Sequence, residues 1–300
     1  MSEFFQHLVN GLSLGTIYAL IALGYTMVYG VLKLINFAHA DVFMVGAYTG
    51  LFSARWLRGE NNEDNYARAG AVLVISMLVS AGLGMLIERL AYRPLRARPR
   101  LTSLITAIGV SFFLENGAQL LWSPDPRRFP RLFESHTYFI GNTAISSMQI
   151  IAFLVAVAMM GALQWLVFRT RFGLAMRAVS FEPSTAALMG VPVDRTISIT
   201  FAVGSGLAAG AAILFGLQYP RVEPFMGLML GLKAFVAAVL GGIGNVPGSM
   251  VGGLVLGLAE EFVAGYGLSS YRDAVAFAIL IAILILRPEG IFGRSVAEKV

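Results

Sequence analysis

Residues 238–260 read AVLGGIGNVPGSMVGGLVLGLAE, a nearly uncharged run in which glycine recurs every four residues. Gly244, Gly248 and Gly252 have this spacing, and so do Gly253 and Gly257. Small residues at this interval let helix backbones approach closely where lipid supplies no hydrophobic drive. The pattern therefore predicts closely packed membrane helices. Static packing is our first interpretation of each pair, and sliding or rocking helices are the alternative.

Composition supports a membrane location for the rest of the chain. Its 300 residues are 57% hydrophobic and 13% charged, with a mean hydropathy of +0.74. So few charges cannot cover the surface of a soluble domain. The net charge of +5 lies in short patches between apolar runs, which argues against nucleic-acid binding. The lack of cysteine excludes disulfides, thiolate zinc sites and cysteine nucleophiles.

Apolar runs long enough to approach the thickness of a bilayer recur along the whole chain. A helix needs about 20 such residues to cross the hydrocarbon core. The predicted spans are 5–32, 41–56, 70–91, 101–121, 148–168, 196–216, 228–243, 249–264 and 273–287. We expect 41–56 to be partly inserted, and 228–243 with 249–264 to form a re-entrant pair or two thin spans. The prediction is an all-α polytopic membrane protein: one domain over 1–300, with about eight or nine transmembrane or half-membrane helices in one bundle.

Positive charge predicts the orientation of these spans. Basic residues gather in three clusters, Arg89, Arg93, Arg96, Arg98 and Arg100; Arg169, Arg171, Arg177 and Arg195; and Arg287, Arg294 and Lys299. An alternating path places all three, and Lys33, on one face, which the positive-inside rule assigns to the cytoplasm. The N-terminus and the loop 122–147 then lie in the periplasm, and the C-terminus lies in the cytoplasm. Since Lys33 is the first basic residue, we expect the opening run to be retained.

The loop 169–195, RTRFGLAMRAVSFEPSTAALMGVPVDR, is too patterned for a bare connection. Ser180 can cap a helix over roughly 181–189 that carries Glu182 and Pro183 in its first turn, and Gly190 with Pro192 can end it. Such a helix is too short to be stable alone and needs a surface to dock on. Its expected contact residues are Ala186, Ala187, Leu188 and Met189. A partner protein and the lipid headgroups are the two candidate surfaces.

Polar residues interrupt the segment 30–48, GVLKLINFAHADVFMVGAY, at the inner end of the first span. Lys33, Asn36, His39 and Asp41 would cost a few kcal/mol in lipid, so they should face protein or water. A pathway lining is the default hypothesis. A hydrogen-bonded structural break is favoured over a metal site or a proton relay for His39 and Asp41, because two ligands without a third are weak.

Three further polar positions lie within or beside apolar runs. Lys233 and Glu260 are on neighbouring predicted helices and could form an ion pair. We interpret Glu88, next to Arg89, as an interface rim residue.

Recognised catalytic patterns are missing from the sequence. It contains no G-x-x-x-x-G-K-[ST] loop and no H-E-x-x-H. We therefore expect no catalytic residues, no metal site and no cofactor or nucleotide bound by this chain.

Several motifs together resemble the branched-chain amino acid ABC transporter permeases of the LivH type. They are INFAHADVFMVGAY at 35–48, the loop 169–195 and the glycine run 238–260, with LGTIYALIALGYTMVYG at 14–30, ERLAYRPLR at 88–96 and RPEGIFGR at 287–294. The similarity runs nearly from end to end. Ala40 stands where the family usually has glycine, and alanine is small enough that we expect no change of function.

The resemblance implies a permease subunit of an importer in the bacterial inner membrane. Its partners would be a LivM-type permease, two cytoplasmic ATPases that bind ATP and Mg²⁺, and a periplasmic amino-acid-binding protein, within membrane lipid. Leucine, isoleucine or valine would pass between the two permeases. The resemblance assigns ATPase coupling to Arg177, Glu182, Ala186, Leu188, Met189 and Gly190, and suggests Asn36, Phe37, His39 and Asp41 for the translocation pathway.

Two alternative functions remain open. Urea and short-amide permeases, or permeases for other amino acids, share these motifs. An ion-gradient-driven transporter would instead use His39, Asp41, Glu115 and Glu260 within the apolar runs. A membrane-embedded enzyme lacks any clustered nucleophile and base.

Overall fold

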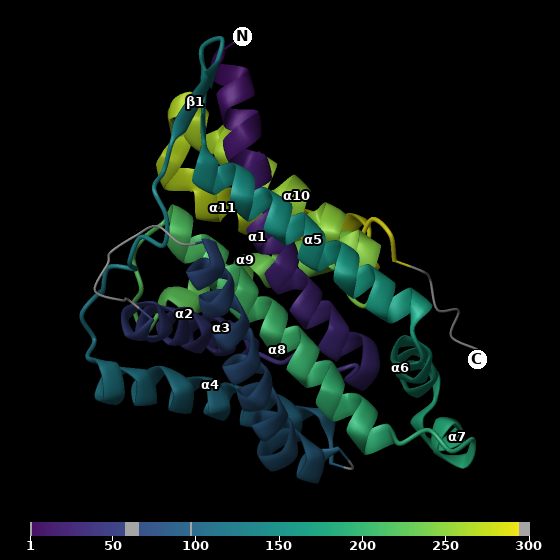
Figure 1. The fold of residues 1–300 in the computed structure, drawn as a ribbon. Helices are drawn as coiled ribbons and strands as arrows, with labels where there is room; N and C mark the ends of the chain where they lie inside the picture. The colour runs from purple at the N-terminus through teal and green to yellow at the C-terminus, as the bar shows by residue number, and fades with distance from the viewer. Residues whose placement is uncertain (1, 58–65, 97, 294–300) are drawn as a thin grey trace.

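The computed structural model describes residues 2–57, 66–96 and 98–293, and each predicted apolar span is helical within it (Figure 1). The corresponding helices are α1 (Ser2–Leu32), α2 (His39–Trp56), α3 (Tyr66–Ile87), α4 (Arg100–Trp122), α5 (Ser147–Arg169), α8 (Val193–Gln218), α9 (Met226–Gly241), α10 (Val246–Val263) and α11 (Arg272–Leu286). The prediction of an all-helical polytopic membrane protein is thus confirmed. Arg294 and Lys299 of the third basic cluster lie outside the described residues.

Smaller elements connect these helices. They are the π-helix η1 (Glu88–Tyr92), the 3₁₀-helix η2 (Arg93–Leu95), β1 (Thr137–Ile140), β2 (Thr143–Ser146), α6 (Arg171–Phe181), α7 (Pro183–Leu188), the π-helix η3 (Ala264–Leu268) and the 3₁₀-helix η4 (Ser269–Tyr271). The strands were not predicted. They pair antiparallel across a two-residue turn that starts with Gly141 at φ 62°, a residue that two-residue hairpin turns favour.

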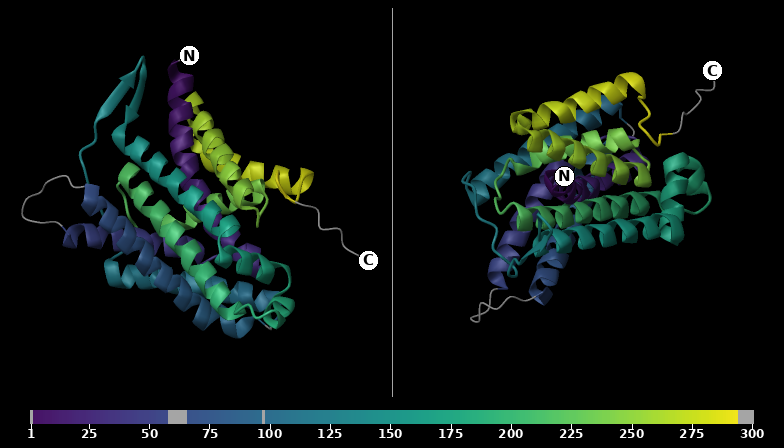
Figure 2. Two further views of the ribbon diagram at one scale, coloured as in Figure 1. Left: turned by 45° about the vertical axis from the view of Figure 1, so that its right-hand side comes forward. Right: turned by 90° about the horizontal axis from the view of Figure 1, so that it is seen from above.

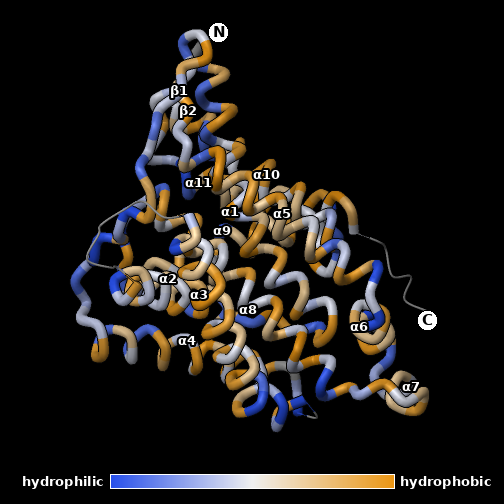
Figure 3. Tube along the Cα trace, in the orientation of Figure 1, coloured by the Kyte–Doolittle hydropathy of each residue, from blue (hydrophilic) through white to orange (hydrophobic). Residues whose placement is uncertain are grey.

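Within the described residues, six helical stretches are long and apolar enough to cross a membrane: Glu3–Leu32, Tyr66–Leu95, Leu101–Trp122, Ser147–Arg169, Val193–Gln218 and Val246–Leu286. The last of these contains the bend at η3 and η4. Figure 3 shows apolar residues along the helices and hydrophilic residues gathered toward the hairpin and the connecting turns. The shorter α2 and α9 are instead covered by other helices over most of their surface.

α1 is the central helix of the bundle. It is buried along nearly its whole length and contacts α8, α10, α9 and α5. Glycine explains the close approach of α10, because a Cβ at Gly257 would lie 2.3 Å from the Cα of Gly15. A Cβ at Gly253 would lie 2.4 Å from the backbone nitrogen of Ala19. The face of α10 toward α9 is equally smooth, since Cβ atoms at Gly248 and Gly252 would meet α9 carbonyl oxygens at 2.2 and 2.1 Å.

Gly244 differs from these four packing glycines. It lies in the turn between α9 and α10 at φ 93°, and α10 begins only at Val246. A left-handed backbone favours glycine because it has no Cβ. The side chain of Asn245 then caps α10 by accepting a hydrogen bond from the N–H of Gly248. Gly244 thus belongs to the turn, although its spacing matches the helix interface.

The connections gather at two ends of the bundle (Figure 2). The N-terminus and the β hairpin lie at one end, which we call the hairpin end, and α6 and α7 lie at the other, the α7 end (Figure 1). α10 runs antiparallel to α1, because Gly11 lies against Leu258 whereas Gly30 lies near Gly244. An ion pair joins Arg93 to Asp194, which places η2 beside the first turn of α8 at the α7 end.

We expect Gly257→Ala to destabilise the protein. Alanine favours a helix by about 1 kcal/mol over glycine, but here its Cβ would force α1 and α10 apart at a cost of about 1–3 kcal/mol. Gly161→Ala on α5 is the matched control, since nothing lies within 4 Å of a Cβ there. Thermal unfolding in detergent should show a lower midpoint for Gly257→Ala only. An equal or higher midpoint for both variants would contradict the packing role.

Candidate functional site

A non-helical segment, residues 33–38, separates α1 from α2, and we call it the break. Lys33 has a φ of 54°, which ends α1, and α2 starts six residues later at His39. Within this break Asn36 is 3% exposed, and its side-chain oxygen accepts a hydrogen bond of 2.7 Å from the hydroxyl of Tyr92 in η1. This contact fixes the break to the segment that follows α3.

His39 and Asp41 are both buried in the first turn of α2. The imidazole of His39 packs where Gly24 has no Cβ, with its ring centroid 4.7 Å from that of Tyr25. Ser111 and Glu115 of α4 are polar neighbours of the Asp41 side chain. His39 therefore lies inside a helix interface, whereas Asp41 faces α4.

A cavity of about 170 Å³ lies beside this break. Its walls come from α1, the break, α2, α4 and α9, and include Tyr25, Phe37, Ala40, Ser111, Phe112, Glu115 and Leu228. The volume is below the roughly 300–1,000 Å³ of drug-sized ligand sites, so the cavity suits only a small solute or part of one. Of the four residues predicted for the pathway, Phe37 lines the cavity, whereas Asn36, His39 and Asp41 are not among its lining residues.

The N-terminal ends of α2 and α9 meet at this cavity. A Cβ at Gly227, in the first turn of α9, would lie 2.2 Å from the carbonyl oxygen of Ala40. Helix N-termini carry partial positive charge and favour anionic groups. The first N–H groups of α2 already donate to the carbonyls of Asn36, Phe37 and Ala38, so α2 offers its dipole rather than free donors.

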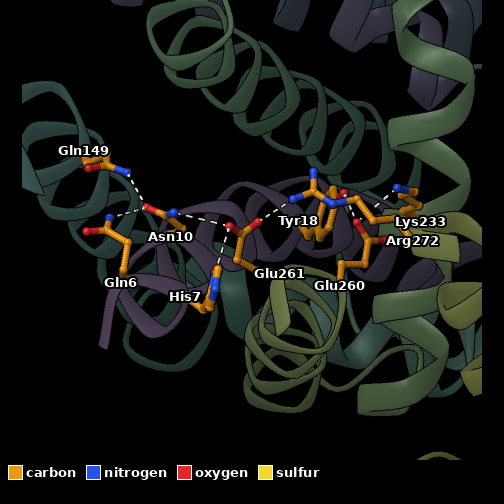
Figure 4. A network of polar contacts seen from close by, with 9 residues as sticks. All are labelled: Gln6, His7, Asn10, Tyr18, Gln149, Lys233, Glu260, Glu261 and Arg272. Atoms are coloured by element: carbon orange, nitrogen blue, oxygen red, sulfur yellow. Dashed lines mark hydrogen bonds and ion pairs between the residues drawn. The ribbon is translucent and has the colours of Figure 1, made fainter. Parts of the chain in front are cut away.

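A second polar region lies toward the hairpin end and was not predicted as a unit (Figure 4). The proposed pair of Lys233 and Glu260 is confirmed, with 3.0 Å between the ammonium nitrogen and a carboxylate oxygen. Asp273 also pairs with Lys233 at 2.7 Å, and the hydroxyl of Tyr18 donates to Glu260 at 2.9 Å. These contacts tie α9, α10, α11 and α1 together.

Glu261, the neighbour of Glu260, organises the rest of Figure 4. Its carboxylate pairs with Arg272 at 2.7 Å and accepts a hydrogen bond of 3.2 Å from Asn10. Gln149 of α5 donates to the Asn10 side chain at 3.0 Å. Asn10, Gln149, Glu261 and Arg272 line a wide cavity of about 870 Å³ that also borders the loop at 128–136. The adjacent pair Glu260–Glu261 signals buried charge in the sequence, but its partners lie on other helices, and two of them, Asn10 and Tyr18, are more than 240 positions away.

The structure corrects the helix predicted at 181–189. Residues 171–181 form α6, capped by Thr170, whose hydroxyl accepts from the N–H of Gly173 at 3.1 Å. Ser180 is inside α6 and donates to the carbonyl of Arg177, so it caps nothing. α7 covers only Pro183–Leu188 and has no side-chain cap. The prediction used Pro183 as the start of the first helix in this loop. Pro183 instead starts a second helix, after α6 has ended.

α7 presents two large apolar side chains. Leu188 is 88% exposed and Met189 is 81% exposed, whereas Ala186 is buried rather than turned outward. The chain leaves α7 at Gly190, which has a φ of 83° and so uses the left-handed backbone that glycine tolerates. An exposed apolar pair at the C-terminal end of a six-residue helix is the feature expected of a docking element.

The two charged residues predicted for coupling have local partners. Arg177 donates to the carbonyl of Val167 at the end of α5 at 2.5 Å and lies over the ring of Phe168. Glu182 accepts a hydrogen bond of 2.6 Å from Ser184 and is exposed. Arg177 thus fixes α6 against α5.

The interpretation of Glu88 as a rim residue is wrong. Its side chain is fully buried and is bonded by Arg96 and by Ser198 of α8. Arg96 also pairs with Asp194 at 2.6 Å, and Arg93 pairs with the same carboxylate. The apparent partner Arg89 is adjacent in sequence, but the π-helical turn directs Glu88 toward α8 instead.

Comparison with known proteins matches this architecture to a family of permeases. Residues 7–284 match the family model described as branched-chain amino acid transport system / permease component. The chain is 43% identical to the high-affinity branched-chain amino acid transport system permease protein BraD of Pseudomonas aeruginosa, over 99% of this chain and 98% of that protein.

Two other relatives are also transport permeases. Identity is 41% to the high-affinity permease protein LivH of Escherichia coli K12, with the same coverage. It is 29% to the xylose/arabinose import permease protein XylH of Sulfolobus acidocaldarius, over 71% of this chain and 60% of that protein. Because the family model matches residues 7–284, which is nearly the whole chain, the chain belongs to the branched-chain amino acid transport system permease family.

Proposed function

We propose that this chain is a membrane-spanning permease subunit of an ATP-driven importer that moves leucine, isoleucine and valine into the cytoplasm. Its identity of 43% to BraD over 99% of its length is the observation that carries the proposal. The chain itself binds no nucleotide in this scheme. ATP and Mg²⁺ are bound by two ATPase partners, a LivM-type permease completes the membrane unit, and a periplasmic binding protein delivers the substrate.

The cavity beside the break is our candidate for a portion of the translocation pathway. It combines apolar walls from Phe37, Phe112 and Leu228 with the polar groups of Ser111 and Glu115. A branched-chain amino acid needs both, because its side chain is apolar and its ends are charged. α4 and the first turn of α9 carry exposed apolar residues beside the cavity, including Phe112, Leu228 and Met229. A second permease that covers this face would complete the path.

α7 is our candidate for the coupling element. ATP-driven closure of the ATPases would move a helix seated on them, and a rigid helix passes such motion into the bundle. Leu188 and Met189 supply the apolar contact, and Gly190 joins it to α8. On this proposal the α7 end is cytoplasmic and the hairpin end, with the wide cavity, is periplasmic and receives the binding protein.

Two other functions make different demands. A urea, short-amide or sugar permease would keep the same machinery, and the 29% identity to XylH shows that the wider similarity includes a sugar importer. An ion-driven transporter would need titratable groups on its pathway; His39 is packed against Gly24 and Tyr25, whereas Glu115 lines the cavity. Uptake by the reconstituted complex, competed by leucine, valine, urea and xylose in turn, separates the substrates. Uptake by this chain alone would exclude the ATP-driven proposal.

Orientation is testable with single cysteines because the chain contains none. Asn142→Cys lies at the exposed tip of the hairpin and Ser184→Cys is exposed on α7. A maleimide that cannot cross membranes should label Asn142→Cys in intact spheroplasts and leave Ser184→Cys unlabelled until the cells are lysed. The reverse pattern would invert the orientation.

Leu188→Asp should uncouple ATP hydrolysis from uptake. Burying a charge in a dry apolar contact costs on the order of 2 kcal/mol or more, which is about 30-fold in affinity for the ATPase. Co-purification of the ATPase and uptake per ATP are the measurements. Ser184→Asp adds the same charge at a polar position of α7 and serves as the control. Normal co-purification and normal uptake in Leu188→Asp would contradict docking on an ATPase.

Ser111→Phe should block the pathway without disturbing assembly. The ring would fill much of the cavity of about 170 Å³, so leucine uptake should fall by about tenfold or more while ATP hydrolysis continues. Gly109→Phe places the same ring about 200° around α4, where nothing lies within 4 Å of a Cβ. Uptake should persist in this control. Equal uptake in both variants would remove the cavity from the pathway.

A further inference from the structure

The ERLAYRPLR segment at 88–96 forms the only described π-helix at the α7 end, within residues 2–57, 66–96 and 98–293. π-helical turns cost regular hydrogen bonding and occur frequently at functional sites. Here the turn directs Glu88 toward α8 and Tyr92 toward the break between α1 and α2. One short segment thus contacts both the helix that follows α7 and the break beside the candidate pathway.

Charged contacts join this segment to the first turns of α8. Arg93 and Arg96 both pair with Asp194, and Ser198 donates to Glu88 one turn further along. The rings of Tyr92 and Phe201 lie 5.3 Å apart and extend the contact by another turn. Asp194, Ser198 and Phe201 lie on one face of α8, because their spacing follows the helical period.

The buried carboxylate of Glu88 is the anchor of this cluster. Exposed ion pairs such as Arg93–Asp194 contribute little by themselves. Glu88 is fully buried, and Arg96 and Ser198 compensate its charge. Removing a partner from a buried charge is costly, so the segment and α8 resist separation here.

The cluster is connected closely to α7 at one end and to the break before α2 at the other. Only four residues, 189–192, separate α7 from α8, and the N–H of Val191 donates back to the carbonyl of Ala186 at 3.0 Å. At the other end the hydroxyl of Tyr92 bonds Asn36 at 2.7 Å, and α2 begins three residues after Asn36. A displacement of α7 therefore has a continuous route of bonded groups to the start of α2.

We propose that η1, η2 and the first turns of α8, fastened by Glu88, Arg93, Arg96, Asp194 and Ser198, form one rigid strut that transmits the movement of α7 to the break at Asn36. This inference rests on the proposed function of α7. It assigns Glu88, Asp194 and Ser198 as positioning residues, which act on the pathway without lining it.

The test removes the polar contacts that α8 makes with the segment 88–96 and leaves the buried Glu88–Arg96 pair in place. In the complete complex with its permease, ATPase and binding-protein partners, Asp194→Asn with Ser198→Ala should keep assembly and ATP hydrolysis. Leucine uptake per ATP should fall by roughly fivefold or more, the lower range of coupling energies. Arg195→Gln with Ser205→Ala is the matched control, since it removes a charge and a hydroxyl from the same helix outside the cluster. Unchanged uptake per ATP in the first variant would overturn the strut.

A cross-linking experiment distinguishes a rigid strut from a contact that must open during transport. Arg93→Cys and Asp194→Cys, with Ser198→Ala, can be bridged by a reducible bis-thiosulfonate in complexes whose partner subunits lack cysteine. A strut predicts that the bridge restores uptake and that dithiothreitol removes it again. Uptake arrested by the bridge while ATP hydrolysis continues would show that the two segments must separate, which overturns the proposal. If the unmodified complex shows no ATP-driven uptake, the proposed function fails instead.

Discussion

The contact of α1 with α10 through glycine is the constraint on which this fold depends. In a membrane interior the hydrophobic effect does not drive helices together, so their association requires close van der Waals packing. Gly15 against Gly257 and Ala19 against Gly253 allow that approach along two turns. α1 thereby becomes the buried axis of the bundle, and Asn36 and Ala38 in the break that follows it are buried against protein rather than exposed to lipid.

The polar groups of the break are compensated by partners within the protein. Backbone and side-chain polar groups must find partners within the protein where lipid excludes water. The N–H groups at the start of α2 bond the carbonyls of the break itself, and Asn36 bonds Tyr92. The short helix α2 can therefore start inside the bundle, and the first turn of α9 packs against it beside the same cavity. The same requirement accounts for the partners of Lys233 and Glu260 in Figure 4.

The spans could be predicted from the sequence because length and continuous apolarity are local properties, and every predicted span is a helix. The pairing of Lys233 with Glu260 could also be predicted, since two opposite charges in adjacent apolar helices need each other. The role of Glu88 could not, because its partner Ser198 on α8 is 110 positions away and Glu88 lies in a π-helical turn. Ala186 and Ser180 were misplaced for a related reason, as local caps do not reveal α6.

These observations separate two kinds of polar residue in the membrane domain. Ser111 and Glu115 lie on the wall of a cavity and can meet a solute. Asn36, Glu88 and Asp194 contact other protein groups, so their chemistry is used to fix one helix relative to another. The proposed function needs both kinds, because in that scheme the force enters at α7 whereas the solute passes near α4 and α9. The polar contacts must hold the helices between these two sites together as they move. The buried carboxylate of Glu88, with its two partners, provides such a contact.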